Sequence, residues 1–355
     1  MQVFSCSTRL IFGPDALEHL KTLSAKTVLV VTDRFFAENG LAARIAAMIP
    51  GAEAVIFDEV QPDPATELVA RGAALLQRHR PQVLLALGGG SSLDCAKGIL
   101  LTAEPRPYFV AIPTTSGTGS EVTSFSILTH GGVKKPLVDP ALRPDCAILD
   151  DTLLEKLPAG LIADAGMDAV THCVEAVAAK GRSPVTDALA AEACRTLLTL
   201  LPRSYAGDRS VRGQLHLAAT MAGIAFDNAG LGVGHALAHA LGGRYHVPHG
   251  RLGGILLPAV LDCNSRVAAG QYAMLARACG LGAATDLLAL RNLRQAVVHL
   301  RAALGLPATL REVGVVLDDA DAVAEAALAD ACLQGNPRPV DKNDLKKLLR
   351  AVQGP

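Results

Sequence analysis

The sequence predicts a chain of two unlike halves: an α/β half with a parallel sheet over residues 1–155, followed by an all-helical half over residues 156–355. Three observations favour this division. In the first 150 residues, short runs of Val, Ile and Leu alternate with helix-like apolar spacing. Beyond that point strand-like runs nearly vanish. The length of 355 residues also exceeds what one hydrophobic core ordinarily supports.

Four apolar runs in the first half are expected to be strands, because each is short and rich in Val, Ile or Leu. They cover residues 27–33, 52–60, 81–90 and 108–115. Helix-like spacing lies between them, at residues 38–49, 65–80 and 93–103. Such alternation is typical of βαβ units, whose parallel sheet is covered on both faces and binds ligands at the carboxyl ends of its strands.

In the second half the pattern is rich in Ala and Leu and has helical spacing, as in residues 183–204 and 290–305. Strand candidates are almost absent there. The boundary between the halves is expected between residues 150 and 161.

Composition argues against several classes of partner. The formal net charge of −1 offers no basic surface for nucleic acid, and aromatic residues make up only 3% of the chain. No run of about 18 apolar residues predicts a membrane span, and no secretory signal is visible at the N-terminus. The eight cysteines are scattered and are interpreted as reduced. We therefore expect a cytoplasmic protein without nucleic-acid or membrane partners.

A glycine run, Gly88-Gly89-Gly90-Ser91-Ser92, separates a predicted strand from a predicted helix. Glycines let backbone amides approach an anion closely, and the helix that follows adds its positive N-terminal end. This arrangement suits a diphosphate, although it is not the GxGxxG pattern of dinucleotide-binding proteins. The alternative interpretation is an ordinary tight turn.

A second loop, IPTTSGTGSEVT at residues 112–123, follows the next predicted strand. Its hydroxyl groups and flexible backbone suit contacts to a nicotinamide ribose and to phosphate. The alternative is a plain connection, since Ser, Thr and Gly also favour turns.

Asp33 closes the first of the predicted strands. A carboxylate there can accept hydrogen bonds from adenosine ribose hydroxyls and repel a 2′-phosphate, which favours NAD over NADP. Alternatively, Asp33 caps a helix that begins near Phe35. The two roles are compatible.

One aspartate and a group of histidines form the strongest functional signal. Asp168 and His172 are four residues apart, so on one helix they project from the same face. Four of the ten histidines lie within residues 235–249, and His235 and His239 have the same spacing of four. A glycine-containing turn can bring His249 back toward them. A carboxylate with three imidazoles suits Fe²⁺ or Zn²⁺, while a structural or coincidental cluster is the alternative.

Several long motifs resemble, in order, the signatures of the iron-containing (group III) alcohol dehydrogenase family. They are GGGSSLDCAKG, AIPTTSGTGSEVT, AGMDAVTHCVEA and AFDNAGLGVGHALAHALGGRYHVPHG, and NPRPVDKNDLKKLL extends the resemblance to the C-terminal region. Within the family the chain is most similar to the 1-propanol dehydrogenase branch of propanediol-utilising bacterial microcompartments and its ethanolamine-pathway relatives. The resemblance implies a Rossmann-like NAD-binding half, a metal-binding half and a homodimer or larger homo-oligomer.

The resemblance also implies roles for particular residues. It implies a proton-relay, catalytic role for His239 and a place in the substrate pocket for Phe226. The implied metal ligands are Asp168, His172, His235 and His249. The implied NAD-binding residues are Asp33, Gly90, Ser91, Asp94, Thr114, Thr115, Thr118, Thr123 and Lys134. A shift of one residue would exchange Lys134 for Lys135.

The function implied is hydride transfer between NAD(H) and a small primary alcohol or aldehyde, such as 1-propanol and propanal, with Fe²⁺ or Zn²⁺ as Lewis acid. Encapsulation in a microcompartment, with shell or enzyme partners, is left open. The alternatives are a dehydroquinate-synthase-like or glycerol-dehydrogenase-like enzyme and a non-catalytic metal- or nucleotide-binding scaffold. The chain departs from the family pattern at residues 251–254, where Arg-Leu-Gly-Gly replaces a small apolar pair and Asn-Ala.

Overall fold

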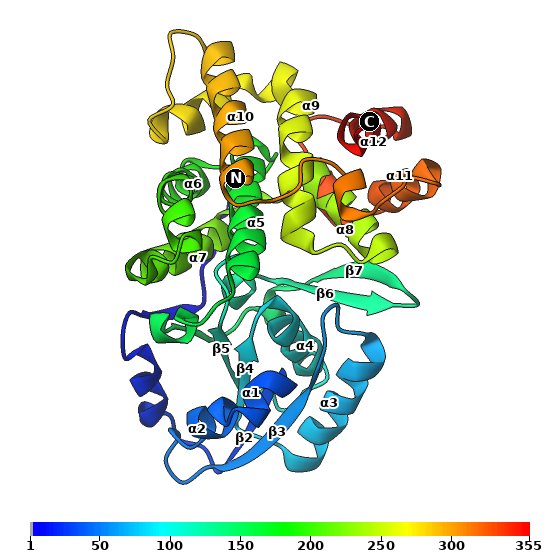
Figure 1. Cartoon of the computed structure of the whole chain (residues 1–355). Coiled ribbons are helices and arrows are strands. Elements are labelled where there is room, and N and C mark those ends of the chain that lie inside the picture. The colour runs from blue at the N-terminus through cyan, green and yellow to red at the C-terminus, as the bar shows by residue number, and fades with distance from the viewer. Residues whose placement is uncertain (1–2) are drawn as a thin grey trace. The chain divides into compact units, whose positions relative to one another are not determined.

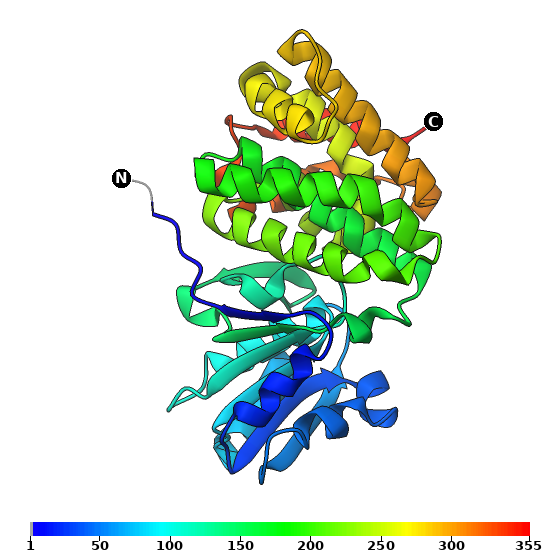
Figure 2. The same cartoon turned by 90° about the vertical axis from the view of Figure 1, so that its left-hand side faces the viewer.

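A computed structural model describes residues 3–355, and Figures 1 and 2 show it from two sides. Contacts between residues divide the chain into an α/β unit, Cys6–Lys156, and a helical unit, Leu157–Pro355. The segment that ends at Ser5 groups with the helical unit, although the sequence assigned it to the α/β half. Its Ser5 backbone exchanges two hydrogen bonds with the Asn228 side chain, at 2.7 and 3.0 Å.

The α/β unit is built on a six-stranded sheet with the order β1-β8-β5-β4-β2-β3, in which every pair is parallel. The strands are β1 (Arg9–Phe12), β2 (Thr27–Asp33), β3 (Glu53–Val60), β4 (Val83–Gly88), β5 (Tyr108–Pro113) and β8 (Cys146–Leu149). The order changes direction between β2 and β4, because β3 lies outside β2 and β5 lies outside β4. In open parallel sheets such a switch point leaves a crevice at the carboxyl ends of the two strands.

Both faces of the sheet are covered, as the continuous apolar runs predict. Leu29 and Val31 of β2 pack with residues of α3 and α4, whereas Val28 and Val30 pack with residues of α2 on the other face. The helices of this unit are α1 (Arg34–Glu38), α2 (Leu41–Ala46), α3 (Thr66–His79) and α4 (Gly90–Leu100). Short 3₁₀ segments lie at Ala16–Thr22, Ser120–Val122, Pro140–Leu142 and Asp151–Leu154.

The four predicted strands correspond to β2 through β5, and three further features escaped sequence reasoning. β1 and β8 have four residues each, which is too short to show a period. The antiparallel hairpin of β6 (Phe125–His130) and β7 (Val133–Val138) was missed as well. The predicted helix at 38–49 contains only the last residue of α1 and the whole of α2, because Gly40, with a left-handed φ, separates the two helices.

The helical unit contains no strand among the residues that the structure describes from 157 onward. Its helices are α5 (Ala159–Ala178), α6 (Pro184–Tyr205), α7 (Arg212–Ala229), α8 (Val233–Tyr245), α9 (His249–Ala278), α10 (Asp286–Ala303), α11 (Ala320–Leu328) and α12 (Lys342–Gln353). Short 3₁₀ segments lie at Arg209–Val211, Arg311–Val313 and Ala331–Gly335. None of the described helices combines the length and the apolar character needed to cross a membrane.

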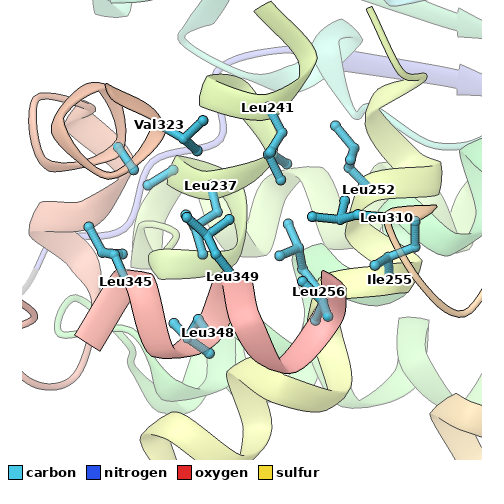
Figure 3. Packing of buried hydrophobic residues seen from close by; sticks show 14 of the residues in the cluster. Leu237, Leu241, Leu252, Ile255, Leu256, Leu310, Val323, Leu345, Leu348 and Leu349 are labelled. Atoms are coloured by element: carbon cyan, nitrogen blue, oxygen red, sulfur yellow. The ribbon is translucent and has the colours of Figure 1, made fainter. Parts of the chain in front are cut away.

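One hydrophobic core fixes the rotation of α8. Leu237 and Leu241 of α8 pack against leucines of α9 and α12 (Figure 3). His235 and His239 are each offset by two residues from these leucines, and two residues turn an α-helix by about 200°. Burying the leucines therefore presents both histidines on the opposite side of α8.

Candidate metal centre and nucleotide loops

The predicted metal ligands come from three helices of the helical unit. Asp168 and His172 lie one turn apart on α5, and His235 lies in the first turn of α8. His249 is the first residue of α9, after a turn in which His246 adopts a left-handed φ of 55°. A turn does bring His249 back toward the others, but it consists of residues 246–248, and the glycines expected in it lie inside α8.

The ligand atoms converge on one carboxylate oxygen. Asp168 Oδ1 lies 3.5 Å from His249 Nε2, 3.8 Å from His235 Nε2 and 3.9 Å from His172 Nε2. These separations are longer than hydrogen bonds. Ligands about 2.1 Å from one tetrahedral ion lie roughly 3.4 Å from each other, so each of these three spacings suits two ligands of one metal ion. The ligand atoms of Asp168, His172 and His235 all lie within 4.8 Å of one another, whereas His249 is close to Asp168 but stands outside this tighter group.

The hydrogen bonding of this cluster also fits a metal ion. Within residues 3–355, Asp168 Oδ1 and His235 Nε2 are buried and have no hydrogen-bond partner. Buried polar atoms are ordinarily satisfied, so two such atoms 3.8 Å apart fit a cation that both would bind. Carboxylate and imidazole donors suit Fe²⁺ and Zn²⁺.

Burial and charge shift the pKa values at the cluster. Burial raises the pKa of the Asp168 carboxyl to about 6, against the opposing effect of His235. Burial by itself would lower the pKa of the His235 ring, but the hydrogen bond and charge of Glu175, together with Asp168, raise it. The His249 side chain is 28% exposed, against 3–6% for the other side chains of the cluster, so the cluster meets solvent at His249.

Glu175 was not predicted from the sequence, yet it contacts His235 directly. Its Oε2 lies 2.6 Å from His235 Nδ1. A carboxylate can only accept, so Nδ1 carries a proton, and Nε2 is the ring nitrogen that faces Asp168. Glu175 lies seven residues after Asp168, on the same face of α5, so helical spacing was the signal that could have identified it.

His239 has a separate buried partner. Its Nδ1 lies 2.9 Å from Asp330 Oδ2, and the Cys332 backbone N–H donates to Asp330 Oδ1 at 2.8 Å. Burial by itself would raise the pKa of Asp330, but the hydrogen bond and charge of His239 hold it below its usual value. The His239 ring stacks on His249, with 5.0 Å between ring centroids. No local pattern links His239 to Asp330, which is 91 residues away in the sequence.

Phe226, predicted to line a substrate pocket, lies near the end of α7 and packs on a predicted ligand. Its ring stacks on His172 with 4.3 Å between centroids and 25° between planes. His172 in turn stacks on His235 at 4.7 Å. Phe226 is thus an apolar wall against the imidazole cluster.

The two loops that were predicted to bind a nucleotide touch each other in the α/β unit. An added Cβ at Gly90 would lie 2.9 Å from Thr118 Cγ2, and one at Gly89 would lie 3.5 Å from Thr115. Gly88 has a φ of 144°, and Thr114 N donates to its carbonyl at 2.9 Å. Gly90 and Ser91 form the first turn of α4, so the amides of that turn lie beside the second loop.

Asp33 ends β2 at the switch point of the sheet. Its Oδ1 accepts from Phe36 N at 3.2 Å and caps α1, as the alternative interpretation predicted. Its Oδ2 lies 3.8 Å from the position of a Cβ on Gly88. One carboxylate oxygen therefore caps the helix while the other faces the glycine loop.

Asp94 and Lys97 lie one turn apart on α4 and form hydrogen bonds with the end of the second loop and with the strand that follows it. Asp94 accepts from Ser120 Oγ at 2.8 Å and from Ile127 N at 3.1 Å. Lys97 is fully buried and donates to the carbonyl of Thr123 at 2.8 Å and to its hydroxyl at 3.2 Å. Lys97 was missed in the sequence, where its spacing of three from Asp94 was the available signal.

Two other residues singled out in the sequence are engaged in ion pairs. Lys134 Nζ lies 2.6 Å from Asp63 Oδ1, and its side chain is 8% exposed. Arg251, at the family departure, forms a two-point pair with Asp164 at 2.9 and 3.1 Å. The added cation is thus neutralised one turn before Asp168.

Comparisons with known proteins cover nearly the whole chain. A family model described as "Iron-containing alcohol dehydrogenase" matches residues 7–151, and one described as "Fe-containing alcohol dehydrogenase family, C-terminal" matches residues 162–353. The 1-propanol dehydrogenase PduQ of Salmonella typhimurium is 39% identical, covering 99% of this chain and 100% of the relative. The NADPH-dependent butanol dehydrogenase of Clostridium saccharobutylicum is 35% identical, with coverage of 99% and 98%. A crystal structure of 1,3-propanediol oxidoreductase superposes with a TM-score of 0.93 at 33% identity, with coverage of 99% and 100%.

Proposed function

The chain belongs to the iron-containing alcohol dehydrogenase family, and we propose that it interconverts 1-propanol and propanal by exchanging hydride with NAD(H). Because it belongs to this family, the chain is a metal-dependent oxidoreductase of small alcohols and aldehydes. The observation that carries the proposal is the approach of three histidine Nε2 atoms to Asp168 Oδ1, at 3.5–3.9 Å.

In this proposal Asp168, His172, His235 and His249 hold Fe²⁺. When bound, the ion supplies Lewis-acid polarisation of the substrate oxygen. The protein holds the ligand side chains in a fixed orientation and excludes water from them. Three of the four are almost fully buried, and His235 is held in the required tautomer by Glu175.

His239 is proposed as the proton carrier. Its Nδ1–H donates to Asp330, which leaves Nε2 free of that proton and able to accept one during alcohol oxidation. The negative charge of Asp330 stabilises the imidazolium that forms. In aldehyde reduction the same Nε2 gives the proton back.

The substrate and nucleotide preferences rest on local chemistry and on relatives. Phe226 offers an apolar surface against His172, which suits a short alkyl chain. The relative that is 39% identical acts on 1-propanol. Asp33 favours NAD, because its Oδ2 at the switch point would repel a 2′-phosphate.

The test is an anaerobic assay of metal-free protein reloaded with Fe²⁺ or Zn²⁺, given C2–C4 aldehydes with NADH or NADPH. We expect the highest kcat/KM with Fe²⁺, NADH and propanal. His249→Ala should abolish the metal-dependent rate, since it removes one of the four ligands. Unchanged aldehyde reduction by His249→Ala would overturn the metal assignment, and a preference for charged substrates would overturn the substrate assignment.

We also propose that the enzyme is a cytoplasmic homodimer or larger homo-oligomer that works inside a bacterial microcompartment. Similarity to the 1-propanol dehydrogenases supports this location. Light scattering of the purified protein tests the oligomer. Co-sedimentation with microcompartment shells tests encapsulation, and recovery only in the soluble fraction would contradict it.

A further inference from the structure

The N-terminus of α8 is closed by two buried side chains from distant parts of the helical unit. Helices ordinarily leave their first four N–H groups without an intrahelical partner. Here Gly232 N donates to Glu175 Oε2 at 3.1 Å, and Gly234 N donates to Glu175 Oε1 at 2.7 Å. Val233 N donates to Asn336 Oδ1 at 3.2 Å. Protein side chains therefore accept from all three amides.

Glu175 joins this cap to the imidazole cluster. The oxygen that accepts from Gly232 also lies 3.3 Å from His235 N and 2.6 Å from His235 Nδ1. One carboxylate thus holds the start of α8 and the ring of the ligand that α8 carries. Because Glu175 lies on the same face of α5 as Asp168 and His172, it links the two helices that supply these ligands.

The sequence around α8 is adapted to this close approach. A Cβ on Gly232 or on Gly234 would lie 2.9 Å from Glu175 Oε1, so larger residues would push the carboxylate away. Glu175 is 3% exposed, and a buried carboxylate is costly unless donors surround it. The backbone amides and the positive end of α8 supply that compensation.

The charge of Glu175 also completes the proposed centre. A divalent cation held by Asp168 and neutral histidines keeps one uncompensated positive charge in a buried site. The Glu175 carboxylate accepts a hydrogen bond from His235 Nδ1–H, and its negative charge compensates the positive charge of the site through that ring. A neutral side chain of equal size would fill the same space but would leave the positive charge of the metal site uncompensated.

We infer that Glu175 is a positioning residue that couples the docking of α8 to metal binding, by fixing the helix start and the His235 tautomer together. The inference rests on the metal site proposed above. It assigns no contact between Glu175 and the metal.

The test compares Glu175→Gln with a matched control, Asn336→Ala. Both variants weaken the cap of α8, but Asn336 holds it through Val233 N, while Glu175 also holds the His235 ring. Co²⁺ is titrated into each metal-free protein, and its visible spectrum and affinity are recorded beside the melting temperature of the metal-free form.

We expect Glu175→Gln to weaken Co²⁺ binding about 10–100-fold and to shift the Co²⁺ bands. Asn336→Ala should melt at a lower temperature and keep Co²⁺ affinity within about threefold, since outer partners matter through the ligand they hold. If Glu175→Gln does not fold, Glu175→Asp is titrated in its place with the same expectation. Wild-type affinity and spectrum in the Glu175 variant would overturn the inference, as would equal losses in both variants. A wild-type protein that binds no Co²⁺ would instead refute the proposed function.

Discussion

Replacing Gly250 by Ala should disrupt the metal centre although no ligand is replaced. A Cβ at this position would lie 1.9 Å from the Asp164 carbonyl oxygen and 3.1 Å from Asp168 Cβ. Carbon–oxygen contacts need about 3.3 Å, so α9 and α5 would have to separate by roughly 1.4 Å. His249 precedes Gly250, and its Nε2 now lies 3.5 Å from Asp168 Oδ1.

Two opposing effects decide the size of the change. Alanine in a helix gains at most about 1 kcal/mol over glycine. Metal sites tolerate distance errors of about 0.2 Å, so displacing His249 by more than 1 Å amounts to losing a ligand. We expect metal affinity to fall by more than about 100-fold, or roughly 2.8 kcal/mol, which exceeds the gain in helix propensity.

The assay is competitive metal titration of the purified variant, with the melting temperature of the metal-free form measured alongside. Gly254→Ala is the matched control on the same helix, because the nearest atoms to its Cβ belong to side chains, with the flexible Met167 first at 3.0 Å. That control should bind metal like the wild type. Wild-type metal affinity in Gly250→Ala would refute the reasoning that close α5–α9 packing sets the His249 position.

Other expectations follow from single side chains. Lys97→Met should raise the Kd for NAD at least about tenfold in calorimetric titration while metal affinity stays unchanged, because the buried ammonium holds the loop carbonyls; an unchanged Kd would contradict this. Asp330→Asn should lower kcat about tenfold or more with full metal content, since it removes the charged acceptor of the relay histidine; a loss of metal at unchanged kcat would argue against that role. Phe226→Ala should cost about 3–5 kcal/mol in urea unfolding, because the ring is buried, and a loss below 1 kcal/mol would exclude tight packing there. Asp33→Gly should raise kcat/KM for NADPH relative to NADH, and an unchanged ratio would show that this carboxylate does not select the nucleotide.

Prediction from the sequence succeeded where the signal is local. The buried strands β2, β4 and β5 are visible in the sequence as continuous apolar runs, and Asp168 and His172 are brought together by helical spacing alone. The glycine loop between β4 and α4 could also be predicted from the sequence, because the conformation of a few consecutive residues determines such a loop.

The differences between the structure and the predictions made from the sequence also have physical causes. β1 and β8 are too short to show a period, and each pairs with a strand far away in the sequence. Lys134 was expected to contact the nucleotide, and its ammonium is paired with Asp63, which lies in the loop between β3 and α3. Its role with NAD stays a prediction.

By itself the sequence determined the two kinds of unit, the helix faces that carry aspartate and histidine, and the loops at the carboxyl ends of the strands. These depend on backbone periods of 3.6 and 2 residues, which act within a few turns. Only the tertiary structure decided that Glu175 contacts His235, that Asp330 contacts His239 and that Gly250 lies against the Asp164 carbonyl of α5. Those contacts join segments 60 to 91 residues apart, and which side chains meet there depends on how whole helices pack.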